Sequence, residues 1–126
     1  MGLEENRAQK EVEEKKLPGP AGKIKAMIGT NVPLEVEWAS FPKAENINHI
    51  GASLKPLEDA IEKVCKDELG KQALKGTLKK ILIRKAGPGT GIAATFQGGT
   101  LTIEQPFDGG NSIGSEAIRG ALEKGL

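Results

Sequence analysis

The chain has 126 residues, a length typical of one domain, and 37% of them are hydrophobic, which is enough to form a core. Its 18 basic and 17 acidic residues give a net charge of +1, so no overall field selects nucleic acid or a membrane surface as a partner. A single cysteine excludes an internal disulfide, and no apolar run in the sequence is long enough to cross a bilayer. Because the N-terminal segment is charged rather than apolar, it does not resemble a secretory signal, and we expect a cytoplasmic protein.

Residues 3–16 are good helix formers that offer very little apolar surface, with only Leu3, Ala8, Val12 and Leu17 able to form a stripe. Such a helix buries little, so we expect residues 1–19 to be a charged helix or a flexible extension, exposed to solvent or completed by a partner. The prolines and glycine at 18–20 end it. Residues 20–126 are then expected to form a single domain.

The next two elements are a short helix and a strand. Apolar residues at helical spacing over 24–28, followed by Gly29 as a cap, favour a helix, with a strand over 23–28 as the alternative. Residues 33–38 alternate between apolar and acidic side chains, which predicts a half-buried strand. The alternating residues are Leu34, Val36 and Trp38 on one side and Glu35 and Glu37 on the other. The side with the only tryptophan should meet the core.

Residues 40–55 have a loop-like composition, and Pro56 opens a strongly amphipathic helix. Gly70 either ends this helix or kinks it, in which case residues 71–75 add a last turn before Gly76. A second strand follows over 78–85, with Ile81 and Ile83 on one face and Leu82 on the other, as in an interior strand. Apolar groups on both faces suggest that it is partly covered on both sides.

Residues 92–97 and 100–107 flank Gly98-Gly99, a two-residue turn that β-hairpins favour because both positions need positive φ. The register that sets Gln97 opposite Thr100 also matches apolar with apolar and threonine with threonine. A final helix follows, with Ile118, Ala121 and Leu122 facing inward.

This order of elements predicts an α+β fold, a two-layer sandwich with a four-stranded mixed sheet and the helices mainly on one face. The strand–helix–strand unit should be parallel, because its crossover is long. The three later strands have short connections, so we expect them to form an antiparallel meander.

Two glutamates and the only histidine are the candidate site residues. Glu35 and Glu37 stand two apart on one strand, so they share a face and could divide acid and base roles or hold a cation. The competing interpretation is that they form the solvated face of an edge strand. His49, in the loop segment Asn46-Ile47-Asn48-His49-Ile50, could carry a proton near neutral pH, but no nucleophile in a recognisable setting accompanies it. One Cys and one His cannot form a zinc site of the usual types, so we expect no metal or other cofactor.

Charge is uneven along the chain, because six basic residues and no acidic one occur between Leu69 and Ile103. These residues are Lys71, Lys75, Lys79, Lys80, Arg84 and Lys85. A basic strip over 71–85 can follow a phosphate backbone, but no aromatic residues alternate with these lysines to stack on bases. Nucleic acid is therefore an unfavoured partner.

The sequence favours a non-catalytic module of unknown function that binds another protein or associates with itself. An enzyme or small-ligand binder that uses Glu35, Glu37 and His49 is the alternative, and a weak nucleic-acid binder comes third. No motif of known activity is found, so no catalytic residue is assigned.

Overall fold

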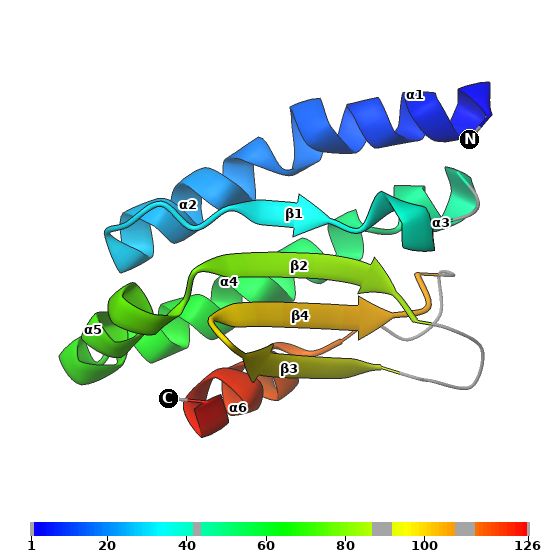
Figure 1. Ribbon diagram of the computed structural model, residues 1–126. Helices are drawn as coiled ribbons and strands as arrows, with labels where there is room; N and C mark the ends of the chain where they lie inside the picture. Colours follow the sequence, from blue (N-terminus) through cyan, green and yellow to red (C-terminus); the bar gives the residue numbers. More distant parts are fainter. Residues whose placement is uncertain (1, 42–43, 87–91, 108–112, 126) are drawn as a thin grey trace.

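The computed structural model describes residues 2–41, 44–86, 92–107 and 113–125 (Figure 1). The helical elements are α1 (Leu3–Glu11), the π-helical segment η1 (Val12–Lys16), α2 (Pro18–Ile28), the 3₁₀ turn η2 (Trp38–Ser40), α3 (Ala44–Asn48), α4 (Gly51–Cys65), α5 (Glu68–Thr77) and α6 (Ser115–Gly125). The strands are β1 (Leu34–Val36), β2 (Lys80–Lys85), β3 (Ala93–Gln97) and β4 (Thr100–Gln105).

The strands form one mixed sheet in the order β1-β2-β4-β3. β2 is parallel to both of its neighbours, β1 and β4, whereas β3 is antiparallel to β4. The predicted four-stranded mixed sheet is confirmed, and so is the parallel pairing of the first two strands through a helical crossover. The predicted antiparallel meander is wrong, because β2 does not pair with β3, the next strand in the chain.

The burial of β4 explains this correction. Leu101, Ile103 and Gln105 alternate along β4 and are all buried, whereas β3 offers only the half-buried Ala94 and Phe96. A central position protects a strand on both edges, so it favours the strand that buries more side chains. This gain outweighs the tendency of neighbouring strands in the chain to pair.

The β3–β4 hairpin has the predicted turn and register. Gly98 and Gly99 have φ values of +57° and +83°, in the left-handed region where a side chain is disfavoured. Gln97 lies opposite Thr100, and Phe96 lies opposite Leu101. The local turn signal therefore sets the whole pairing.

Helices α2, α4 and α6 lie on one face of the sheet and α5 packs at its end, so the predicted two-layer α+β arrangement is confirmed (Figure 1). The largest core cluster lies between the two layers and contains Ile24, Ile28, Leu57, Ile61, Leu74, Ile81, Leu101, Ile103, Ile118 and Leu122. The helix expected over 24–28 is also present, and Gly29 caps it with φ +88°.

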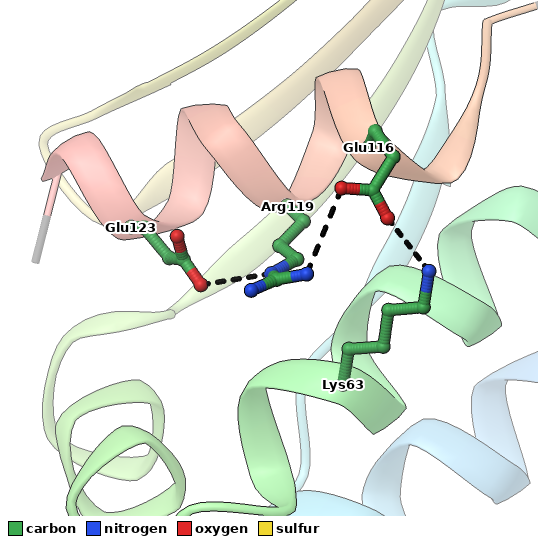
Figure 2. Close-up of polar contacts among 4 residues, drawn as sticks. All are labelled: Lys63, Glu116, Arg119 and Glu123. Atoms are coloured by element: carbon green, nitrogen blue, oxygen red, sulfur yellow. Dashed lines mark hydrogen bonds and ion pairs between the residues drawn. The ribbon is translucent and has the colours of Figure 1, made fainter.

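Charged side chains join α6 to α4 at the surface of this layer (Figure 2). Lys63 Nζ lies 2.6 Å from Glu116 Oε1, across the two helices. Within α6, Arg119 pairs with Glu116 at 3.6 Å and with Glu123 at 2.9 Å. The hydrogen bond from Lys63 lowers the pKa of the Glu116 carboxyl below its ordinary value.

The N-terminal helix lies along the β1 side of the molecule and packs on α3 (Figure 1). Of its sparse stripe, Ala8, Val12 and Leu17 are buried in a second cluster, whereas Leu3 is 65% exposed. That cluster also contains Val36, Phe41, Ile47, Ile50, Leu54, Ile83 and Phe107. The predicted helix is confirmed, and the division of the chain at residue 19 stays a prediction.

Several element boundaries differ from those predicted. The helix expected to run to Gly70 is divided, since α4 ends at Cys65 and α5 begins at Glu68, and α3 lies within the expected loop. Two further differences affect the packing, the first at the start of the sheet. β1 ends at Val36, and Trp38 begins the turn η2 rather than continuing the strand. The Ser40 hydroxyl explains this turn, since it donates to the Glu37 carbonyl at 2.7 Å and accepts from the Lys85 backbone N–H at 3.0 Å. Trp38 is consequently half-buried at the rim of the second cluster, where its ring packs against Phe41.

The second boundary is the start of α4, which begins at Gly51 and includes Pro56 in its interior. A proline there removes one helical hydrogen bond. The added first turn buries Leu54 in the second cluster, and the Ser53 hydroxyl donates to the Ile50 carbonyl at 2.8 Å. These contacts offset the missing bond.

Candidate functional site

The second face of the sheet, which we term the open face, carries no helix among the described residues (Figure 1). Successive strand residues point to opposite sides, so the residues between the core-facing isoleucines and leucines lie here. They include Glu35, Lys80, Leu82, Arg84, Thr95, Thr102 and Glu104. Leu82 is half-buried, so the expectation that β2 is interior is confirmed, whereas a cover over both of its faces is not seen in the described ranges.

Both candidate glutamates lie on this open face, and each pairs with a basic side chain of β2. Glu35 Oε2 lies 3.2 Å from Lys80 Nζ, and Glu37 Oε2 lies 3.3 Å from Arg84 Nε. Arg84 also reaches Glu104 of β4 at 3.1 Å. These side chains are 21–53% exposed, so each pair adds little stability and serves mainly to match charges across neighbouring strands.

His49 directly follows α3 in the chain, and α3 lies beyond the end of β1 (Figure 1). His49 is half-buried, and its backbone N–H donates a hydrogen bond to the Asn46 carbonyl at 3.2 Å. Among the described residues, no hydrogen bond or ion pair joins the His49 side chain to Glu35 or Glu37. The structure therefore brings the two glutamates together but shows no contact between them and the histidine.

The basic residues over 71–85 are spread over α5, the following connection and β2. Two of them, Lys80 and Arg84, are engaged with carboxylates of the open face. Part of the positive charge expected from the sequence is thus balanced within the molecule. This arrangement lends no support to a continuous phosphate-binding track.

The two edges of the sheet differ in their protection. β1 is only three residues long and carries Glu35, and these features discourage strand addition. β3 spans Ala93–Gln97 without a charge or a proline, and the preceding Ile92 is 39% exposed. Apart from the hairpin pairing, none of the hydrogen bonds described for this structure uses an N–H or C=O of residues 93–97. Within the part of the chain that the structure describes, the outer edge of β3 is therefore an open template for another strand.

A hollow of about 290 Å³ runs beside this edge, between β3 and the last turns of α6. Its wall is formed by residues 94–97 of β3 and by Ala121, Lys124 and Gly125 of α6. Phe96 also lines a second hollow of about 270 Å³ near the Gly98-Gly99 turn. The edge of β3 thus combines backbone groups that have no described hydrogen-bond partner with adjoining open space. The end of α6 lies close to this edge, because a Cβ on Gly125 would be 3.2 Å from the Phe96 carbonyl oxygen.

Sequence reasoning did not single out Ala94, Thr95 and Phe96 as site residues. The available signal was the lack of any charge between residues 92 and 103. That signal becomes informative only with the strand order, which places β3 at the edge.

Within the described ranges, no group of three or more His, Cys, Asp or Glu side chains is placed to hold a metal ion. The helices in the same ranges are too short or too polar to cross a bilayer. Comparisons of this chain with models of known protein families, with curated proteins and with solved structures find no match.

Proposed function

We propose that this protein is a non-catalytic association module whose contact surface is the outer edge of β3. The edge would add an extended segment of another chain as a further strand, through main-chain hydrogen bonds. The observation that carries the proposal is the contrast between the charged, short edge at β1 and the neutral, unprotected edge at β3. Natural proteins blunt strand edges that have no partner, so an edge left open favours a binding role.

The partner on this proposal is a protein segment rather than nucleic acid or a lipid surface. The outer edge of β3 has no charge to attract phosphate, since residues 92–98 contain neither lysine nor arginine. We also propose a cytoplasmic location, because a chain with one cysteine gains no internal disulfide from an oxidising compartment.

A short peptide of alternating threonine and valine, with a lysine at each end, tests the edge directly. We expect this peptide to shift the backbone amide resonances of Ala94 and Phe96, which face outward, in a saturable manner. The variant Ala94→Pro removes an outward N–H without breaking the hairpin and should lose the effect. If about 1 mM peptide leaves both amides unchanged, strand addition at β3 is wrong.

A further inference from the structure

The turn of the hairpin determines which backbone groups of β3 are free. Residues that flank a two-residue hairpin turn exchange both hydrogen bonds, so Gln97 and Thr100 form such a pair. Hydrogen-bonded pairs alternate along an antiparallel ladder, so Thr95 and Ala93 also point their N–H and C=O groups toward β4. The N–H and C=O groups of Ala94 and Phe96 must then point outward.

These outward groups are self-complementary, and we infer that the partner of the edge is a second copy of this chain, with β3 paired antiparallel to β3 about Thr95. This inference rests on the function proposed above. In this register Ala94 of each copy lies opposite Phe96 of the other, and each pair exchanges both backbone hydrogen bonds. About four intermolecular hydrogen bonds form, and every residue of β3 has a partner.

Side-chain size favours the same register. Ala94 and Phe96 both face the helical layer, where they pack against the largest core cluster. A small residue of one copy therefore meets a large ring of the other, in both directions. The hollow of about 290 Å³ adjoins Ala94 and Ala121, so it offers space for the Phe96 ring of the second copy.

The lack of charge on β3 also allows a second copy of this chain to pair with it. Like charges directly opposite each other destabilise paired strands, so a charged edge resists self-pairing. Residues 93–97 are all uncharged, and the two residues that meet at the two-fold axis are threonines. The same two-fold pairing between the β1 edges of two copies would bring their Glu35 side chains close together. A dimer formed at β3 therefore closes on itself and leaves only the charged β1 edges, so it does not grow into a filament.

The interface is small, so the dimer should be weak. A single strand pair with one adjoining hollow belongs to the class of interfaces below about 1,200 Å². We therefore expect a dissociation constant on the order of 10 µM to 100 µM. Concentration, rather than a second protein, would then decide how much of the chain is paired.

Sedimentation equilibrium of the whole chain, from about 1 µM to about 1 mM, tests the dimer with a matched pair of variants. Thr95→Lys places two lysines opposite each other at the two-fold axis and should raise the dissociation constant at least tenfold. Thr102→Lys makes the same change on the neighbouring strand, opposite Thr95 in the register. The two copies of that lysine lie about 14 Å apart, three strand spacings, so this variant should still dimerise. Thermal unfolding of both variants checks that each is folded.

Thiol crosslinking tests the register in a Cys65→Ala background. Opposed residues in a non-hydrogen-bonded pair lie about 4.5 Å apart at Cα, within the range of a disulfide. Thr95→Cys should therefore crosslink rapidly under mild oxidation. Ala93→Cys lies on the same exposed side but faces Gln97 of the second copy, so it should not crosslink.

Three results would overturn the inference: a chain that stays monomeric to about 1 mM, a dimer that Thr95→Lys leaves intact, or faster crosslinking through Ala93→Cys. A monomeric chain whose Ala94 and Phe96 amides still respond to the threonine–valine peptide would refute self-pairing alone, and the proposed function would stand. A monomeric chain with unresponsive amides would refute both.

Discussion

At the scale of single residues, two glycines of α5 have opposite surroundings. A Cβ on Gly70 would collide with the Val64 carbonyl oxygen and would lie 3.1 Å from Val64 Cγ1. A Cβ on Gly76 would meet no atom within 4 Å. Gly70 is thus required by the close approach of α5 to the end of α4, whereas Gly76 is not.

We expect Gly70→Ala to lower the free energy of unfolding by about 1–3 kcal/mol, because the α4–α5 corner must shift to admit the methyl group. Gly76→Ala, in the same helix, should raise it by about 0.5–1 kcal/mol through the better helix propensity of alanine. Urea denaturation of both variants measures the difference. Equal effects of the two changes would contradict the close approach at Gly70.

Also at this scale, the sequence correctly predicted that Glu35 and Glu37 share a face, because alternation along a strand is a local property. It did not predict that Lys80 and Arg84 would pair with them, since this depends on the parallel register of β1 and β2. The turn at Trp38 was also not predicted. Its stabilising contact joins Ser40 to Lys85, a residue far away in the sequence.

At the scale of elements, the contact between α4 and α6 should depend on pH. The pKa of Glu116 is lowered chiefly by the hydrogen bond from Lys63, and next by the charge of Lys63. A lowered folded-state pKa adds stability that is present above the ordinary value of 4.5 and is lost as the pH falls through the lowered pKa. Acid should therefore weaken this contact between the helices.

The variant Lys63→Met tests this dependence. It should raise the pKa of the Glu116 carboxyl toward its ordinary value, and NMR titration of that carboxyl measures the change. The stability difference between the wild type and this variant should shrink as the pH falls below 4.5. Glu123→Gln is the control, because it removes a partner of Arg119 and leaves Lys63 and Glu116 in place (Figure 2). A Glu116 titration that is the same with and without Lys63 would exclude this coupling.

The N-terminal helix should contribute to stability despite its polar composition. Val12 is 1% exposed within the second cluster, whereas Glu14 on the same helical segment is exposed. We expect Val12→Ala to cost about 2 kcal/mol, from the lost burial and the remaining cavity. Glu14→Ala should change stability by less than about 0.5 kcal/mol. Thermal unfolding compares them, and an effect of Val12→Ala no larger than that of Glu14→Ala would mean that this helix is not docked.

Elements with strong local signals were the ones predicted well. The hairpin follows from Gly98 and Gly99, and the helix over 24–28 follows from its spacing and its cap. The place of β4 between β2 and β3 was not predictable in this way, because it depends on how much each strand buries in the finished core. The open edge of β3, and with it the candidate site, could be recognised only after the strand order was known.

At the scale of the whole molecule, the two hydrophobic clusters should unfold together. Ile81 and Ile83 lie two residues apart on β2, one in each cluster, and Leu34 packs against both. Trp38 borders the second cluster, so its fluorescence should follow the same urea transition as the far-UV circular dichroism of the chain. A fluorescence transition at lower urea would show that the second cluster opens first.

The central place of β4 also has a consequence for synthesis of the protein. When Lys85 emerges from the ribosome, β2 can pair with β1, but its other edge waits for Thr100–Gln105, the strand that fills the middle of the sheet. A nascent chain grows from its N-terminus at about 5–20 residues per second, so this edge stays unpaired for about a second or more. During that interval the two-stranded sheet of β1 and β2 exposes the apolar side chains of Ile81, Leu82 and Ile83 and an unpaired strand edge, which favour aggregation. A pause that holds Thr100 inside the ribosome after β2 has emerged should therefore increase the need for chaperones more than the same pause once Gln105 has emerged.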